Sequence, residues 1–345
     1  MKKIPKVLNV IMRPLDNICN LYCKYCNIQH KYRRNAFEKK PSEKFTALWK
    51  WFPCLLEQLN GISKIANVTF TWHGGEPLLM PQNEFKRICE AQDFYLRRKN
   101  LDWLNVIQTN GLLLSDDKID FLKDLGIKIG VSIDGPGYSH NKFRFRNRGD
   151  FAMVKNNIYL LRDKDIPFSI CIVVHEHNYR DAKRVFEFIS DINPGNGVAI
   201  SPMFVSAERY IQPAKYEKFL RDLFDEWYKK PGVSVGVFEN FIMGLYGKAP
   251  VLCYFAGRCN SFININSKGE IFGTCEPGKR FRIGKLTVDP LEGVLRRNTN
   301  MFLSISSKAK SKIMCESLGY DPKYKYFIGN CCPNRLVSNE DPYME

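Results

Sequence analysis

Short hydrophobic runs alternate with longer amphipathic stretches along the first two thirds of the chain. The short runs are rich in β-branched residues and have the length of strands, whereas the longer stretches repeat their apolar positions with a helical period. The predicted strands are Val7–Arg13, Asn67–His73, Trp103–Thr109, Lys128–Asp134, Phe168–Val174 and Val198–Phe204. The predicted helices are Ser42–Leu59, Asn83–Lys99, Ser115–Leu125, Phe151–Arg162, Tyr179–Ile192 and Pro213–Tyr228. This alternation is typical of repeated βα units around a parallel sheet.

Polar residues mark the starts of several helices and the ends of several strands. Ser42, Ser115 and Asp150 stand where a side chain could accept hydrogen bonds from free first-turn amides, so we expect them to be N-caps. In parallel βα architectures, functional groups collect where the strands end. Glycine-rich turns follow three of the predicted strands, at His73-Gly74-Gly75, Asn110-Gly111 and Asp134-Gly135.

The rhythm changes after Pro231-Gly232. Residues 251–345 are rich in Cys, Gly, Asn and Pro and have only short hydrophobic runs, which is too little apolar surface for an independent core. Small regions of this kind are usually stabilised by disulfides or metals, and the cysteines of this segment are the candidates. The chain therefore divides into an α/β domain at 1–230, a connecting helix within 231–250 and a small Cys-rich domain at 251–345.

The composition is that of a soluble globular protein. Of the 345 residues, 44% are hydrophobic and 26% are charged, and no apolar run approaches the length of about 20 residues that a membrane span requires. The basic N-terminus is not followed by a signal-peptide core, so we expect a cytoplasmic protein without a membrane partner. Because the cytoplasm keeps thiols reduced, the 12 cysteines indicate metal or cluster ligation rather than disulfides.

The formal net charge of +16 predicts attraction to an acidic partner, such as an acidic peptide, a nucleic acid or an anionic surface. Lys and Arg concentrate at Lys31–Arg34 and Lys142–Arg148, which we interpret as solvated charged faces. No recognition motif for nucleic acid accompanies them, so nucleic acid is the disfavoured partner.

Cys19, Cys23 and Cys26 form a C-x3-C-x2-C triplet in the loop directly after the first predicted strand. Three thiolates this close in sequence can wrap one face of a 4Fe-4S cubane and hold three of its irons. The remaining iron then stays open for an external chelator, whereas structural zinc sites usually close with four protein ligands. The alternative is a zinc knuckle completed by His30 or by a distant cysteine.

With this triplet the chain resembles the radical S-adenosylmethionine (SAM) superfamily, whose fold is a partial (β/α)6 TIM-like barrel. The residues that match its SAM-binding motifs are Tyr25, Gly74, Gly75, Glu76, Asn110, Ser132 and Arg144. The resemblance implies that Tyr25 lies beside the adenine and that the Gly74-Gly75-Glu76-Pro77 turn receives the methionine amino group. It also implies that Ser132 and Arg144 contact the ribose or the carboxylate of SAM.

The same resemblance implies a mechanism. The cluster accepts one electron from a reductant such as flavodoxin or ferredoxin and cleaves SAM, and the resulting 5′-deoxyadenosyl radical abstracts a hydrogen atom from the substrate. Such chemistry belongs to the cofactor, while the protein supplies binding and a dry, shaped cavity.

A second group of cysteines, Cys253, Cys259 and Cys275, flanks a predicted hairpin from Ser261 to Thr274. It resembles the SPASM extension of radical SAM enzymes, in which such a trio and one later cysteine enclose an auxiliary 4Fe-4S cluster. Cys315 lies at a suitable distance along the chain to be that fourth ligand. A zinc site with the same four ligands is the alternative.

The C-terminal segment departs from the full SPASM pattern. Only the adjacent Cys331 and Cys332 appear where the family has a dense run of cysteines, so we expect no second auxiliary cluster. Either residue could donate a hydrogen atom or replace Cys315 as a ligand. The remaining cysteines lie at apolar helix or strand positions and are expected to be small buried core residues: Cys54, Cys89 and Cys171.

The chain also resembles anaerobic sulfatase maturases across nearly its whole length. Glu276 stands where those enzymes place an aspartate base, which makes it a candidate catalytic base, although a solvent-facing hairpin carboxylate is an equal alternative. His73 stands where they usually have Gln, and the Trp72-to-Leu79 segment looks more like SPASM enzymes that modify ribosomally made peptides.

Our leading hypothesis is a maturase that installs a crosslink or another C–H functionalisation in a peptide or protein side chain. The alternatives are formylglycine formation in a sulfatase and a small-molecule dehydrogenase or epimerase in which Cys331 or Cys332 donates hydrogen. A zinc-braced binding module is the reading that involves no catalysis.

Overall fold

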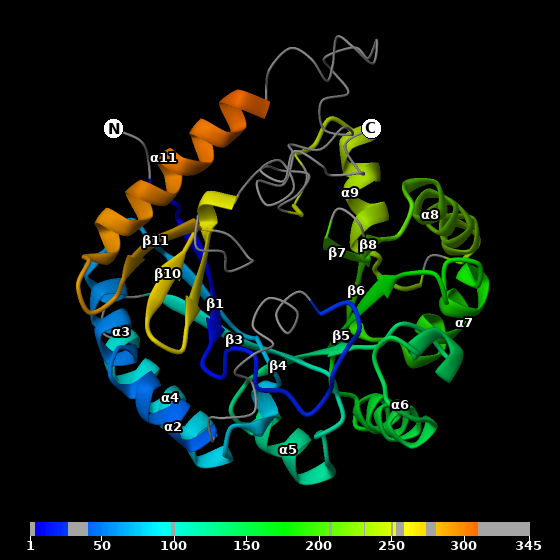
Figure 1. Ribbon diagram of the computed structural model, residues 1–345, viewed down its shortest axis with the longest axis horizontal. Coiled ribbons are helices and arrows are strands. Elements are labelled where there is room, and N and C mark those ends of the chain that lie inside the picture. Colours follow the sequence, from blue (N-terminus) through cyan, green and yellow to red (C-terminus); the bar gives the residue numbers. More distant parts are fainter. Residues whose placement is uncertain are drawn as a thin grey trace.

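Most strands build one curved sheet that is covered by helices on its outer side (Figure 1), and β7 (Phe204–Ser206) and β8 (Arg209–Tyr210) form a separate two-stranded sheet. The computed structural model describes residues 4–26, 41–97, 101–206, 209–230, 232–249, 251–252, 259–273 and 281–309. The strands of the sheet are β1 (Val7–Arg13), β2 (Asn67–Trp72), β3 (Asp102–Thr109), β4 (Lys128–Ser132), β5 (Phe168–Val174), β6 (Gly195–Pro202), β9 (Phe262–Asn266), β10 (Glu270–Phe272) and β11 (Arg282–Lys285). Within these ranges the sheet has nine strands in the order β11-β10-β9-β1-β2-β3-β4-β5-β6.

Helices follow the strands in the manner of βα units. The helices are α2 (Pro41–Trp49), α3 (Phe52–Gly61), α4 (Gln82–Leu96), α5 (Asp116–Asp124), α6 (Arg148–Asp163), α7 (Ala182–Ile192), α8 (Pro213–Lys229), α9 (Gly236–Leu245) and α11 (Leu291–Ala309). Each strand from β1 to β6 pairs in parallel with the next. The predicted partial (β/α)6 barrel is therefore confirmed. Among the described residues, no helix combines the length and apolarity that crossing a membrane requires.

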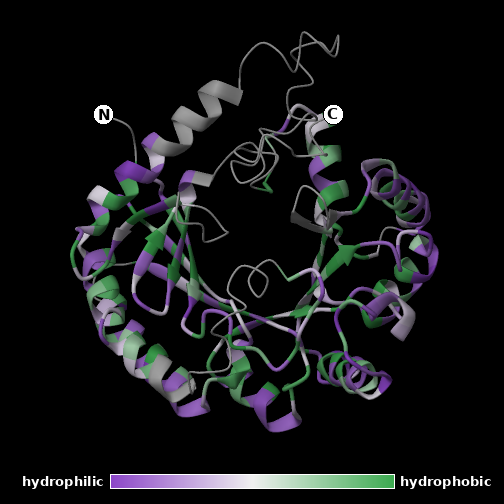
Figure 2. Ribbon diagram, viewed as in Figure 1, coloured by the Kyte–Doolittle hydropathy of each residue, from purple (hydrophilic) through white to green (hydrophobic). Residues whose placement is uncertain are grey.

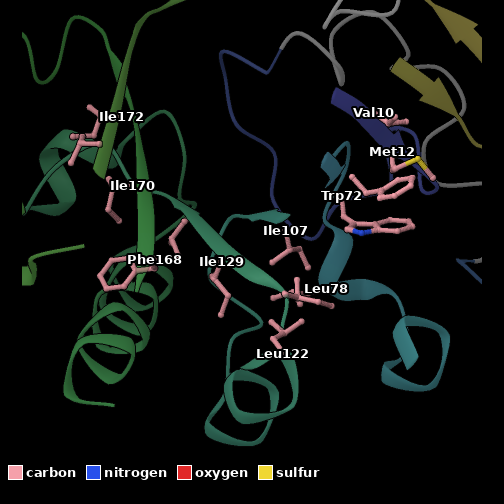
Figure 3. Close-up of a cluster of buried hydrophobic side chains, with 14 of the residues drawn as sticks. Val10, Met12, Trp72, Leu78, Ile107, Leu122, Ile129, Phe168, Ile170 and Ile172 are labelled. Atoms are coloured by element: carbon pink, nitrogen blue, oxygen red, sulfur yellow. The ribbon is translucent and has the colours of Figure 1, made fainter. Parts of the chain in front are cut away.

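Buried side chains fill the space between the sheet and the outer helices (Figure 3). Along β5, Phe168, Ile170 and Ile172 are buried, whereas the residues between them are half-buried. Successive side chains of a strand point to opposite faces. The buried residues of β5 therefore face the outer helices, and the half-buried residues between them face the concave side of the sheet. Hydrophilic residues lie along the outer helices, α8 among them (Figure 2). The concave side of the sheet is therefore the face on which we look for a functional site.

Three local predictions are wrong. The stretch 42–59 is not one helix, because α2 ends at Trp49 and α3 begins at Phe52. Ser42 lies inside α2 and is not its N-cap. The N-cap of α6 is Asn147, whose side chain accepts from the Asp150 N–H at 2.8 Å, so Asp150 belongs to the first turn.

One further cap prediction is confirmed, whereas the predicted burial of three thiols is only partly met. Ser115 caps α5 as expected and accepts from the Lys118 N–H at 3.4 Å. The predicted core cysteines are half-buried rather than fully buried: Cys54, Cys89 and Cys171.

The predicted hairpin is confirmed, and it extends the barrel sheet. β9 pairs with β10 in antiparallel fashion, and β9 also pairs with β1 in parallel, on the side of β1 opposite to β2. The indole N–H of Trp51 donates to the Ser267 carbonyl at 3.0 Å, and Gly269 packs so closely against Trp51 that a Cβ would lie 2.9 Å from its ring. This segment therefore gains from the barrel the support that its own composition lacks. The domain boundaries at 230 and 250 stay a prediction.

Candidate active site

The three N-terminal cysteines lie in a loop that we call the cysteine loop, residues 19–26. It follows β1 through a tight turn in which Asp16 has a left-handed φ of 51°. The Asp16 carboxylate accepts from both the N–H of Ser267, at 2.9 Å, and its hydroxyl, at 2.5 Å. The hairpin turn is thus bonded to the chain only three residues before Cys19.

The donor set fits a cluster. Burial raises the pKa of the Cys19 thiol to about 12, and the nearby charges of Glu76, Cys23 and Cys26 add to the rise, while a hydrogen bond from Leu21 opposes it. Burial likewise raises the pKa of Cys23 to about 11, although Arg144 opposes the rise. The Cys19 and Cys23 thiols therefore stay protonated in the free protein, and a bound metal centre would take the place of these protons.

The spacing of the thiols also bears on the kind of metal centre. Over the part of the chain that the structure describes, no three His, Cys, Asp or Glu side chains converge closely enough to hold a single metal ion. In a cubane each thiolate binds a different iron, so its ligands need not converge. The three thiols are therefore compatible with the corner irons of one cubane.

The turn after β2 packs against the start of the cysteine loop. The Glu76 N–H donates to the Ile18 carbonyl at 2.9 Å. A Cβ on Gly75, whose φ is +56°, would lie 1.9 Å from the same oxygen, and one on Gly74 would lie 2.6 Å from Nε of Arg13. Only glycine allows this close approach with a left-handed backbone.

The Glu76 carboxylate is buried and held by neutral donors. Its Oε1 accepts from the Leu78 N–H at 2.9 Å and from the Thr109 hydroxyl at 2.7 Å, while Oε2 accepts from the Asn110 N–H at 2.8 Å. Burial raises the pKa of Glu76 against these hydrogen bonds. A cationic ligand would stabilise the ionised form. The carboxylate can thus receive an ammonium group such as the amino group of SAM.

Asn110 connects the end of β3 to the cysteine loop. Its amide nitrogen lies 2.7 Å from Oδ1 of Asn20 and 3.7 Å from the Cys19 sulfur, while its amide oxygen accepts from the Leu112 N–H at 2.9 Å. Hydrogen bonds to ligand sulfurs are one way in which proteins set the potential of iron–sulfur clusters. Asn110 is therefore placed to orient Cys19.

Asp134 holds the other end of the cysteine loop. It follows β4 and is fully buried. Its Oδ2 accepts from the Tyr25 hydroxyl at 2.5 Å, and its Oδ1 accepts from Arg144 at 3.2 Å and from the Val173 N–H at 3.1 Å. Burial alone would raise the pKa of Asp134, but the Arg144 charge, the nearby His175 and the Tyr25 hydroxyl lower it to about 2. This carboxylate is ionised and paired.

Arg144 and Tyr25 lie together beside the last cysteines. The guanidinium carbon lies 5.4 Å from the centre of the Tyr25 ring, and the Cys23 sulfur lies 3.8 Å from the Arg144 carbonyl. Nε of Arg144 is buried and has no hydrogen-bond partner among the described residues. This donor suits a carboxylate, which agrees with the predicted contact to SAM.

His175 and Asp134 are the site residues that sequence reasoning missed. Nδ1 of His175 accepts from the His177 N–H at 3.1 Å, which leaves the proton on Nε2, 3.5 Å from Oδ2 of Asp134. Asp134 stands in the Asp134-Gly135 turn after β4, and His175 directly follows β5, so position at a strand end was the available signal.

Not every predicted residue joins these contacts. The Ser132 hydroxyl accepts from the Gln108 amide at 2.8 Å on the concave face of the sheet. Cys259 opens a short 3-10 turn, η5 (Cys259–Ser261), directly before β9. The remaining predicted residues lie outside the described ranges: His30, Cys253, Cys275, Glu276, Cys315, Cys331 and Cys332.

Comparison with known proteins agrees with this geometry. The family profile described as the radical SAM superfamily matches residues 15–189. The serine-type anaerobic sulfatase-maturating enzyme of Bacteroides thetaiotaomicron is 27% identical over an alignment of 292 positions that covers 77% of this chain and 69% of that protein. The cysteine-type enzyme of Clostridium perfringens strain 13 is 27% identical over an alignment of 363 positions, gaps included, that covers 98% of this chain and 92% of that protein.

Solved structures show the same fold. Native anSMEcpe with bound AdoMet superposes with a TM-score of 0.79 at 22% identity, covering 98% of this chain and 94% of that chain. The same protein with bound AdoMet and the Cp18Cys peptide gives a TM-score of 0.74 at 21% identity, covering 97% and 90%.

Proposed function

Because the chain belongs to the radical SAM superfamily, we propose that it abstracts hydrogen from a side chain of a peptide or protein. The observation that carries this proposal is the cysteine loop, which is bonded at one end to the Glu76 turn and at the other to the Asp134–Arg144 pair. The likeness to sulfatase-maturating enzymes over nearly the whole chain supports a macromolecular substrate.

The proposed roles follow from the contacts. Enzymes of this superfamily use a 4Fe-4S cluster and SAM, and the bound pair supplies the 5′-deoxyadenosyl radical. Cys19, Cys23 and Cys26 would hold the cluster. Glu76 accepts the amino group of SAM, and the free Nε–H of Arg144 donates to its carboxylate. Asp134 fixes Tyr25 beside the adenine.

The side-chain product has two candidates. A crosslink or other C–H functionalisation is favoured by His73, which stands where sulfatase maturases usually have Gln. Formylglycine is favoured by relatives named as serine-type and cysteine-type sulfatase-maturating enzymes and by the peptide-bound structure. Glu276 would be the base in the second case.

The C-terminal cysteines and the reductant complete the proposal. Cys253, Cys259, Cys275 and Cys315 are the proposed ligands of an auxiliary 4Fe-4S cluster, which gives roughly eight irons per chain after anaerobic reconstitution. About four irons would remove the auxiliary cluster. Flavodoxin or ferredoxin is the proposed electron donor, and the cytoplasm is the proposed location, because reduced thiols and iron–sulfur clusters persist there.

The test uses the reconstituted protein with SAM, dithionite and peptides under anaerobic conditions. One set of peptides contains the Cys or Ser of a sulfatase. The other set consists of the products of short reading frames beside the gene. Mass spectrometry of the peptide and formation of 5′-deoxyadenosine are measured, and hydrazide labelling separates an aldehyde from a crosslink. The variant with Cys19, Cys23 and Cys26 all changed to Ala should form no 5′-deoxyadenosine. Persistence of that product in the variant would contradict the assignment.

A further inference from the structure

A group of cations lies on the exposed edge of the cysteine loop, and we call it the cluster-loop basic face. Its members are all exposed: Lys24, Lys142, Arg146 and Arg148. Lys24 stands between Cys23 and Cys26, whereas the other three follow η4 (Tyr138–Asn141), more than a hundred positions later. The basic run at Lys142–Arg148 is one of the two that the sequence singles out.

Specific contacts bring these distant segments together. The Lys24 N–H donates to the Phe143 carbonyl at 2.6 Å, and Nζ of Lys24 lies 5.6 Å from the centre of the Phe143 ring. The Arg146 guanidinium donates to the Asn20 carbonyl at 3.2 Å. The segment 142–148 is therefore bonded to the cysteine loop at two places, which brings its cations close to Lys24.

Arg148 and the neighbouring residues extend the same face. Its guanidinium carbon lies 5.9 Å from the centre of the Tyr138 ring, and the Tyr138 hydroxyl donates to the Arg146 carbonyl at 3.3 Å. These contacts tie the start of α6 to η4, so the basic residues keep a defined arrangement.

The charges of the face act on their surroundings. The pKa of His177 is lowered by burial and by the charges of His175, Lys142 and Lys24, against a small opposite effect of Glu176. Glu176 itself is bonded to Lys215 at 2.8 Å, and the nearby Asp181 is bonded to His140 at 3.0 Å. Asp150, in the first turn of α6, is the acid closest in sequence to the face. The local potential is positive, as is the net charge of +16.

We propose that the cluster-loop basic face docks an acidic one-electron carrier protein of the flavodoxin type. The proposal rests on the cofactor named under the proposed function. One electron leaves the carrier and enters the centre held by the three cysteines, and no covalent bond forms or breaks at this face. A carrier seated on Lys24 is adjacent to Cys23 and Cys26, so the electron has a short path.

The physics of redox partners matches such a face. Electron-transfer complexes are small and transient, and charge complementarity steers their encounter. Their association weakens steeply as salt rises. Four cations around one loop are sufficient for this kind of contact, whereas a stable complex would need a larger buried area.

The test reverses two charges of the face that lie outside the SAM-binding residues, in the variant Lys142→Glu/Arg148→Glu. The control variant Lys64→Glu/Lys128→Glu makes the same change in net charge at two exposed lysines, one shortly before β2 and one at the first residue of β4, at the opposite end of the strands from the cysteine loop. The probe is a recombinant flavodoxin of known acidic charge.

Two measurements use flavodoxin and one does not. The dissociation constant of oxidised flavodoxin is measured by calorimetry at low and high salt, and the rate of cluster reduction by reduced flavodoxin is measured by stopped flow. At low salt we expect the face variant to have an about tenfold higher dissociation constant for flavodoxin and an about tenfold lower rate of cluster reduction than the wild-type protein. Both differences should shrink at high salt. SAM cleavage driven by dithionite should be unchanged, because dithionite needs no docking surface.

The other outcomes overturn the proposal. Equal flavodoxin affinity in the face and control variants would exclude docking at this face. Loss of peptide modification under dithionite, with flavodoxin binding retained, would show that the face holds an acidic substrate instead. Failure of the wild-type protein to cleave SAM with dithionite would contradict the proposed function, while flavodoxin binding would still decide the docking question.

Discussion

Two buried carboxylates lie at the two ends of the cysteine loop, and they are in opposite electrostatic states. Glu76, at the Cys19 end, accepts hydrogen bonds from neutral donors, and burial raises its pKa. Asp134, at the Cys26 end, faces the Arg144 guanidinium and the Tyr25 hydroxyl, and its pKa is lowered to about 2. Burial penalises both charges, but only Asp134 has a cation that outweighs the penalty.

The difference indicates a structural role for Asp134 and a ligand-binding role for Glu76. A buried charge that is paired and fully hydrogen-bonded is complete without a ligand, so Asp134 can fix the loop in the free protein. A buried charge surrounded by neutral donors gains most from a cationic partner that arrives later. Glu76 is thus suited to bind part of SAM, and Asp134 is suited to position the residues that bind the rest.

The change Asp134→Asn should have the largest effect. It leaves the buried Arg144 without its counter-charge and turns an amide toward the donors of Tyr25 and Val173. Breaking a buried pair by removing one partner costs about 3–5 kcal/mol of unfolding free energy. The free energy is measured by urea unfolding of the metal-free chain, and SAM binding is followed by the change it causes in the electron paramagnetic resonance signal of the reduced cluster.

Asp181→Asn is the matched control for Asp134→Asn. Asp181 also accepts from a buried basic side chain, His140, but is itself 44% exposed, so its loss should cost about 1 kcal/mol or less. Equal losses of unfolding free energy in the two variants would show that the buried Asp134–Arg144 pair contributes no more to stability than the Asp181–His140 pair.

Glu76→Gln should affect SAM binding more than stability. The amide oxygen keeps part of the hydrogen bonding to Leu78, Thr109 and Asn110, and the cost of burying a charge disappears. We expect a loss of about 1–2 kcal/mol in unfolding free energy, together with an increase of about tenfold in the dissociation constant of SAM. An unchanged dissociation constant would contradict the proposed contact between Glu76 and the amino group of SAM.

A smaller effect is expected where the C-terminal hairpin meets the loop. Ser267→Ala removes the hydroxyl bond to Asp16 but keeps the backbone bond to the same carboxylate. The expected loss is about 1 kcal/mol in unfolding free energy. Ser63→Ala, at an exposed turn, serves as the control in the same urea series. No difference between the two variants would mean that the hydroxyl contributes nothing to the anchor.

The sequence predicted the parts of this arrangement that are local. Periodicity located all six barrel strands, with β1 and β5 matching their predicted ends, because each strand has its own run of alternating residues. Where two polar residues compete for one cap, as Asn147 and Asp150 do, composition alone does not choose between them. The split between α2 and α3 was likewise invisible in an amphipathic pattern that continues across it.

Contacts between distant segments were not predictable in this way. The triplet and the turn at Gly74 to Glu76 were recognised from their spacing, but the pairing of Tyr25 with Asp134 spans 109 positions. The parallel pairing of β9 with β1 joins residues more than 250 positions apart, such as Asn9 and Phe262. Such pairs depend on how the strands are arranged in the sheet, which a local pattern does not specify.

His73, on the Glu76 side of the loop, offers the test with the narrowest pH window. Burial, and then the charge of Arg13, lowers the pKa of His73 from 6.5 to about 4, so the folded protein keeps it neutral while the unfolded chain takes up a proton. Stability should therefore fall as the pH drops from about 6.5 toward 4, because the unfolded state binds more protons in that window. His73→Gln should remove about 3 kcal/mol of this decline in urea unfolding of the metal-free chain. If the stability of the two proteins declines in parallel, burial and the Arg13 charge do not lower the pKa of His73.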